Sequence, residues 1–288
     1  MIINTINLSN KQIVEINNLV ALCEKHDNAK MCIQMDHSLN NAKDLKSWVV
    51  SYTNNELIGV LSIFAPRVDE AEISVCVHPE HRRKGTAGEL LETAHENLNG
   101  FNINTVLYVC DRNSKDGTAA LNSRELKIHH TEYTMKYIRQ MRHTGAQRIT
   151  VKMAGENDIE TMAGILVDAF GGSPDEAKKF IESSIQSETR KGYIGIKDNK
   201  GIGIAFVGYD KDISINTLGI LREEQQKGYG KELLNSIINQ LDYGNKDIVI
   251  DVDSTNIHAY TLYKNNGFKE TVIIDYYQHR KSKNGIQA

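Results

Sequence analysis

The sequence has no long apolar run. Its longest apolar stretches, such as residues 57–66 with Gly59 and Ser62 inside, fall far short of the about 18 residues that a membrane-spanning helix needs. The start of the chain, Met1-Ile2-Ile3-Asn4, lacks the basic segment and apolar core of a secretion signal. We therefore expect a cytoplasmic protein with no membrane partner.

Cysteine is also scarce, and the chain has no excess of positive charge. All of the cysteines lie in the first half, and none are in C-x-x-C spacing: Cys23, Cys32, Cys76 and Cys110. This spacing argues against a zinc site and a disulfide framework, and we expect no metal centre. The net charge is −3, and no Lys/Arg run is interleaved with aromatic residues, so nucleic-acid binding is not expected.

What the chain does contain is material for two domains, because it has 288 residues of which 40% are hydrophobic and 25% charged. A glycine-containing segment occurs twice, in residues 81–91 and again in residues 224–234, each between a strand-like run and a helix. Two landmarks keep a spacing of 143 positions: Arg82 with Gln225, and Asn113 with Asn256. Two copies in register indicate a duplicated domain.

The duplication predicts an N-terminal domain at residues 1–143 and a C-terminal domain at residues 146–288. The boundary falls between residues 140 and 147 and has no proline-rich linker, so we expect the halves to pack together.

Apolar periodicity predicts the same order of elements in both halves, with helices and strands alternating around the glycine loop. In the second half, before the glycine loop, we expect a strand at 148–153, a helix at 156–170, a second helix that starts at a capping box at 173–176 and ends at 186, and strands at 193–197, 203–209 and 213–221. After the loop we expect a helix with an apolar stripe at 233–241, a strand at 247–253, a helix at 256–266 and a strand at 268–279. In the first half we expect a helix at 10–26, strands at 48–53, 57–66 and 72–77, a helix ending at 98, and strands at 104–110 and 131–139.

Each glycine loop precedes a helix and can hold an anion. Glycines let a ligand approach the backbone, the first N–H groups of the helix are free, and the helix N-terminus carries about half a positive charge. Such a site suits a pyrophosphate. It is not the P-loop pattern, and Gly201-Ile202-Gly203 lacks the third glycine of the dinucleotide fingerprint.

Two blocks of the second half, Gln225-x-x-Gly228-x-Gly230 and Asn256-x-x-Ala259-x-x-Leu262-Tyr263-x-x-x-Gly267-Phe268, resemble the GNAT superfamily of acyl-CoA-dependent N-acetyltransferases. The resemblance covers nearly the whole chain. It implies an α/β (α+β) fold of two tandem GNAT domains, each a mixed, mostly antiparallel sheet flanked by helices. The layout with an active second half also resembles the mycothiol synthases, although nothing in the sequence establishes their acceptor.

The resemblance implies that the second half binds acetyl-CoA through its loop, strand end and later helix. The residues carried over as cofactor-binding are Leu218, Gly219, Ile220, Gln225, Gln226, Lys227, Gly228, Tyr229, Gly230, Lys231 and Asn256. Tyr263 is implied as the general acid near the thioester sulfur, because a phenol stays protonated at neutral pH; the alternative is that it only packs the helix against the sheet. Lys227 and Lys231 could equally be surface lysines.

The general base is left open by the sequence. Four carboxylates lie near the expected cleft: Asp212, Glu223, Asp251 and Asp253. We take Asp251 as the candidate base, and a water relay is the alternative.

The first half departs from this pattern. Its loop and strand end are acceptable for CoA: Val75, Val77, Arg82, Arg83, Lys84, Gly85, Thr86, Ala87 and Gly88. Leu121, however, takes the place of the tyrosine, and Arg124-Glu125-Leu126 stands where Gly267-Phe268 should be. A leucine cannot donate a proton. We expect either CoA binding without turnover or a role in building the interface and acceptor pocket.

The expected function is transfer of the acetyl group of acetyl-CoA directly to a primary amine of a small molecule or peptide, by a monomer or homodimer. Residues 146–288 contain no cysteine, which fits transfer without a covalent intermediate. The alternatives are a non-catalytic acyl-CoA-binding regulatory module and a fold that serves only assembly.

Overall fold

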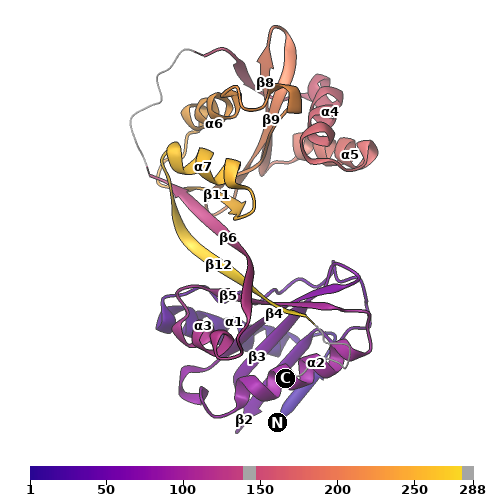
Figure 1. The fold of residues 1–288 in the computed structure, drawn as a ribbon, viewed down its shortest axis with the longest axis vertical. Helices are drawn as coiled ribbons and strands as arrows, with labels where there is room; N and C mark the ends of the chain where they lie inside the picture. Colours follow the sequence, from indigo (N-terminus) through magenta and orange to yellow (C-terminus); the bar gives the residue numbers. More distant parts are fainter. Residues whose placement is uncertain (139–146, 281–288) are drawn as a thin grey trace. The chain divides into compact units, whose positions relative to one another are not determined.

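A computed structural model describes residues 1–138 and 147–280 (Figure 1). The predicted boundary between residues 140 and 147 lies largely outside the described residues. The chain forms two units. Unit 1 is Met1–Glu132 together with the chain from Val272 onward, and unit 2 is Tyr133–Thr271. No helix in the described part of the chain has the length and apolar composition needed to cross a membrane.

Unit 1 is a mixed, mostly antiparallel sheet with helices on both faces. In chain order it holds β1 (Ile2–Thr5), α1 (Asn10–Asp27), β2 (Trp48–Thr53), β3 (Glu56–Phe64), β4 (Glu70–Val77), η1 (Pro79–His81), α2 (Thr86–Asn99), β5 (Thr105–Asp111), α3 (Lys115–Asn122) and the first part of β6 (Lys127–Tyr137). Its strand order is β1-β2-β3-β4-β5-β12-β6. The β4–β5 pair is parallel, and the sequence did not predict β1 or α3.

Two apolar clusters hold this unit together. Leu90, Ala94 and Leu98 of α2 are fully buried against one face of the sheet. Ile16 and Leu19 of α1 pack in a separate cluster with Trp48 and Val60. α1 starts at a capping box in which Ser9 and Gln12 satisfy each other's backbone N–H groups.

Unit 2 repeats this architecture. It holds β7 (Thr150–Met153), η2 (Glu156–Asp158), α4 (Ile159–Phe170), α5 (Pro174–Gln186), β8 (Arg190–Lys197), β9 (Lys200–Tyr209), β10 (Ile213–Ile220), η3 (Arg222–Glu224), α6 (Tyr229–Gln240), β11 (Ile248–Asp253), α7 (Ile257–Asn265) and the start of β12 (Phe268–Arg280). Its strand order is β12-β6-β11-β10-β9-β8-β7. α5 begins at the predicted proline, but the predicted capping box is absent there because the Ser173 side chain makes no cap hydrogen bond.

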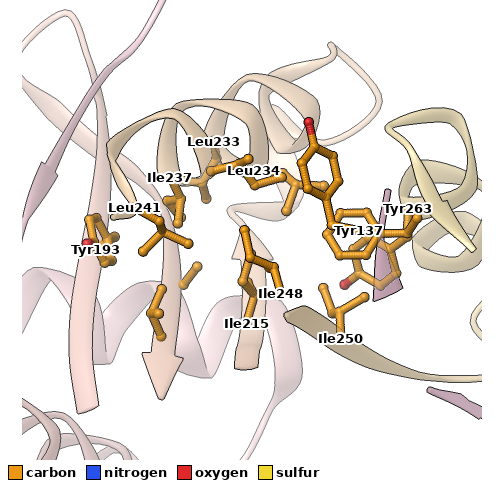
Figure 2. Close-up of a cluster of buried hydrophobic side chains, with 14 of the residues drawn as sticks. Tyr137, Tyr193, Ile215, Leu233, Leu234, Ile237, Leu241, Ile248, Ile250 and Tyr263 are labelled. Atoms are coloured by element: carbon orange, nitrogen blue, oxygen red, sulfur yellow. The ribbon is translucent and has the colours of Figure 1, made fainter. Parts of the chain in front are cut away.

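The core of unit 2 lies between its sheet and α6. The predicted apolar stripe of α6 is buried: Leu233, Leu234 and Ile237 have no exposed surface and Leu241 has 7%. Figure 2 shows these side chains pointing onto Ile215, Ile248 and Ile250 of the sheet, with Tyr263 at one end of the cluster. α4 and α5 cover the other face through a second cluster.

The two terminal strands are exchanged between the halves. β12 comes from the second half, yet its residues Ile274 to Arg280 pair antiparallel with Asp111 to Thr105 of β5 in unit 1. β6 comes from the first half and lies next to β11 of the second. The units therefore do not coincide with the predicted halves 1–143 and 146–288. Apolar alternation identifies a strand but carries no information on which strand it pairs with.

The spacing between the halves also changes along the chain. Gly85 and Gly228 are N-caps of α2 and α6 and keep the spacing of 143. Beyond β5 and β11, which have 7 and 6 residues, the N-caps are Ser114 and Asn256, 142 positions apart. The sequence pairing of Asn113 with Asn256 is therefore wrong by one residue.

Candidate functional sites

The loop before α6 presents unpaired backbone amides. Gly228 has φ +89° and Gln226 has φ +59°, two left-handed residues that turn the chain sharply into the helix. Within the described residues, the N–H groups of 226–230 make no hydrogen bond, and the first amide to find a partner is that of Lys231, which donates to the Gly228 carbonyl at 3.1 Å. These amides and the helix N-terminus together can hold a phosphate.

Side chains fix this loop to its surroundings. Gln225 Nε2 donates to the carbonyl of Ile220 at 3.0 Å, which ties the loop to the end of β10. Lys227 pairs with Glu224 at 3.1 Å, so its charge is already partly engaged.

Arg148 is a loop neighbour that the sequence did not indicate. Its guanidinium donates to the Lys227 carbonyl at 2.8 Å, pairs with Glu232, and lies over the Tyr229 ring at 4.6 Å from the ring centre. Its Nη2 is 3.0 Å from the position that a Cβ on Gly228 would take. No local signal could have found it, because about 80 residues separate it from the loop. Its positive charge lies directly at the amides, and the ion pair with Glu232 partly neutralises that charge.

The end of β10 separates from β11. The two parallel strands pair only at Ile213 with Ile248 and Ser214 with Val249. A bulge follows between Asn216 and Gly219, where Thr217 has φ +52°. Beyond it, β10 continues to Ile220 paired with β9 alone, so the strand end that contains Leu218 and Gly219 has an open edge on the β11 side. An open edge offers backbone N–H and C=O groups to a ligand.

Tyr263 lies beside the α6 core at the end of the apolar cluster (Figure 2). It is 6% exposed, and burial raises its pKa to about 12. Within the described residues its hydroxyl makes no hydrogen bond, so the group is available to a ligand. Asn256, predicted to contact the cofactor, uses its side chain to cap α7 by accepting from the Ala259 amide at 3.1 Å.

Three of the four candidate carboxylates, Asp251, Asp253 and Glu223, have different environments. Asp251 is exposed and accepts a hydrogen bond from the Thr134 hydroxyl at 2.7 Å. Asp253 accepts from the amide and hydroxyl of Thr255 in the turn before α7. Glu223 is engaged with Lys200 at the surface. Ile248, Ile250 and Val252 lie in the α6 cluster, so strand alternation places Asp251 on the opposite face of the sheet.

The first loop has the same backbone shape as the second. Gly85 has φ +89° and Arg83 has φ +58°, and α2 begins at Thr86. In the part of the chain that the structure describes, the N–H groups of 83–88 make no hydrogen bond. Arg82 Nε donates to the Val77 carbonyl at 3.0 Å, which matches the contact of Gln225 with its own strand end.

Unit 1 contains a cavity of about 600 Å³ at this loop. Its walls are the ends of β4 and β5, the loop and α3, and they include Val75, Val77, Gly85, Gly88, Tyr108 and Leu121. β4 and β5 pair only as far as Ile73 with Tyr108, so the cavity lies where the strands separate. The sequence predicted the loop and the strand end that border this cavity, but it did not predict the cavity itself.

Charged side chains border the mouth of this cavity. Both carboxylate oxygens of Asp27 accept from Arg82 at 2.8 Å, and Asp116 accepts from Arg82 and Arg83 at 3.2 Å. Burial is the largest effect on Asp27 and opposes its ionisation, but the hydrogen bonds and charges of Arg82 and His26 together outweigh burial and keep the pKa of Asp27 below the usual value. Arg83 and then Arg82 lower the pKa of Asp116. The arginines at this loop are therefore partly neutralised.

The tyrosine position of unit 1 is occupied by leucine. Leu121 lies 142 positions before Tyr263, the spacing of the two N-caps, and it lines the cavity. Glu125 has φ +55° at the place where Gly267 has φ +89°. Counting from the two N-caps thus gives Leu121 and Glu125 as the counterparts of Tyr263 and Gly267.

Comparison with known protein families finds one match in each half of the sequence. A model described as acetyltransferase (GNAT) family matches residues 15–121, and one described as acetyltransferase (GNAT) domain matches residues 166–286. No curated protein sequence matches the chain.

Several solved structures share the fold over nearly the full length. A GCN5-related N-acetyltransferase from Sphaerobacter thermophilus has a TM-score of 0.77 at 14% identity, over 97% of this chain and 95% of that one. A GNAT-family acetyltransferase from Colwellia psychrerythraea has a TM-score of 0.66 at 11% identity, over 97% and 100%. A tandem GNAT protein from the clavulanic acid biosynthesis pathway has a TM-score of 0.68 at 10% identity, over 97% and 98%. The chain therefore belongs to the GNAT superfamily and carries two GNAT domains in tandem.

Proposed function

We propose that this chain is an acetyl-CoA-dependent N-acetyltransferase whose second half transfers the acetyl group to a primary amine of a small molecule or peptide. The observation that carries the proposal is the set of unpaired amides at 226–230 beside the open edge of β10. Membership in a family of acetyltransferases supports it.

The residues of the second half fit a CoA thioester. The free amides, the N-terminus of α6 and Arg148 complement the negative charge of a pyrophosphate. The open edge at Leu218 to Ile220 offers backbone groups to the pantetheine amides and the acyl carbonyl. When bound, the thioester supplies an activated acyl carbon.

The chemistry then needs one proton removed and one supplied. A protonated amine cannot attack a thioester, and the exposed carboxylate of Asp251, directly or through water, can take that proton. Tyr263 can protonate the departing thiolate, because its pKa of about 12 keeps the phenol protonated at neutral pH. The absence of cysteine from residues 146–288 supports direct transfer from thioester to amine.

For the first half we propose CoA binding without turnover. Its cavity and loop amides fit the same ligand, whereas Leu121 has no proton to give.

A steady-state assay across an amine panel tests the function. We expect one or more amines to raise CoA release above hydrolysis, and Tyr263→Phe to lower kcat about 100-fold with little change in affinity for acetyl-CoA. Tyr260→Phe is the matched control, since Tyr260 lies on the same helix but bonds Glu270 at the surface. Acetyl-CoA binding with no responsive amine would instead support the non-catalytic regulatory module.

A further inference from the structure

A phenylalanine lies directly on the strand end that we take as the acyl-binding edge. A Cβ built on Gly219 would be 2.6 Å from Cε2 of Phe170 and 3.1 Å from Cβ of Ala169. Side-chain carbons do not approach each other to 2.6 Å, so only glycine fits at 219 while Phe170 keeps this position. The ring therefore packs on the main chain of β10 itself.

The helix end that carries Phe170 is tied to the same region. Asp168 Oδ2 accepts from the backbone N–H of Arg222, the first residue of η3 after β10, at 2.6 Å. The Gly171 amide donates to the Val167 carbonyl at 2.8 Å and closes the last turn of α4. These contacts keep the end of α4 against the end of β10.

Phe170 nevertheless remains 55% exposed, although phenylalanine is among the residues most often buried. Part of the ring contacts Gly219, which lies just beyond the β10 bulge where the strand is paired on one side only, and more than half of the side chain stays exposed. An aromatic ring that is fixed on a ligand-accessible strand end and left half open acts as a wall of the space beside that strand.

We propose that Phe170 limits the length of the acyl group that the second half accepts, because its ring occupies the space against Gly219 that a chain longer than acetyl would enter. This inference rests on the proposed function, because it takes the end of β10 as the place of the acyl carbonyl. One methylene at such a wall changes selectivity by about 10-fold or more.

The test compares acetyl-, propionyl- and butyryl-CoA with wild type and Phe170→Ala, by binding and by transfer to a responsive amine. Wild type and every variant in this test also carry Gly85→Ala, which weakens CoA binding at the first loop. The second site then dominates the measured binding. We expect Phe170→Ala to raise the preference for butyryl- over acetyl-CoA at least 10-fold, and Phe170→Leu to give a smaller rise. Met153→Ala, which removes an equally exposed apolar side chain of unit 2, should leave the preference unchanged.

A wild-type chain that already prefers butyryl-CoA, or a Phe170→Ala preference within 2-fold of wild type, would overturn the inference. The binding measurements distinguish a failure of this inference from a failure of the proposed function. If no amine is acetylated, the proposed function fails, while a shifted binding preference still establishes Phe170 as the wall of the acyl slot.

Discussion

Asp275 and Arg112, which are 163 positions apart in the chain, form a bidentate ion pair inside unit 1. Arg112 Nη2 and Nε donate to the two carboxylate oxygens of Asp275 at 2.6 and 2.8 Å, and Asp275 is only 1% exposed. The Thr131 hydroxyl donates to the same carboxylate at 2.7 Å. This pair fastens the exchanged strand β12 to the end of β5.

Asp275→Asn should therefore destabilise unit 1. It removes the buried negative charge that pairs with Arg112, and we expect a loss of about 2 kcal/mol in the free energy of unfolding, reduced from the cost of a fully buried pair because Arg112 is 45% exposed. Glu160→Gln, which breaks an exposed pair with Lys178, should have a much smaller effect, because solvent and salt screen that pair. Denaturant unfolding and amide exchange of β5 measure both; equal effects of the two changes would refute the role of the pair.

The exchange of strands predicts that the first half cannot fold alone. A fragment of residues 1–143 lacks β12, so the β5 edge and the apolar cluster of Leu107, Ile274 and Tyr276 are left incomplete. We expect the fragment to aggregate or to unfold without a cooperative transition, and a peptide of residues 272–280 to restore cooperativity. Circular dichroism and sedimentation report the outcome. A fragment that melts like unit 1 of the full chain would contradict the prediction.

The two loop glycines can be compared directly, since both have φ +89°. The Cβ added by Gly85→Ala has no atom within 4 Å, so the only cost is the strain of a left-handed alanine, about 1 kcal/mol. The Cβ added by Gly228→Ala has the same strain and also displaces the guanidinium of Arg148. We expect each change to weaken acetyl-CoA binding at its own loop and only Gly228→Ala to lower turnover. Calorimetry and steady-state rates separate the loops. Loss of turnover with Gly85→Ala alone would place catalysis in the first half.

Glu72 of β4 predicts a pH effect on stability. Burial, and then the charge of Glu132, raise its pKa to about 7. A carboxyl whose folded pKa is raised above 4.5 favours the folded state at low pH and loses that contribution as pH rises through 7. Glu72→Gln should then be more stable than wild type by about 1 kcal/mol at pH 8, with little gain at pH 4.

The matched control is Glu70→Gln on the same strand, which breaks an ion pair with Arg67 and should not stabilise the protein at either pH. Denaturant unfolding at the two pH values gives the comparison. A Glu72→Gln gain that is equal at pH 4 and pH 8 would mean that titration of Glu72 is not its source.

The local parts of the candidate sites could be predicted from the sequence. Glycine before a helix permits the positive φ of Gly85 and Gly228, and the apolar stripe of α6 needs only its spacing to predict a buried face. That a residue other than tyrosine stands at this position of the first half was likewise visible in the repeat, although the sequence spacing of 143 leads to Ala120 and only the N-cap spacing of 142 leads to Leu121.

Only the tertiary structure decided which distant residues meet. Four features join segments that are far apart in the chain: the contact of Arg148 with the second loop, the packing of Phe170 on Gly219, the pairing of β12 with β5 and the cavity of unit 1. The sequence by itself determined the duplicated glycine loops and their helices, because backbone conformation and amphipathic spacing are set by neighbouring residues. Strand partners and loop contacts were decided by the fold, because edge hydrogen bonds and apolar faces accept any strand or side chain of matching shape.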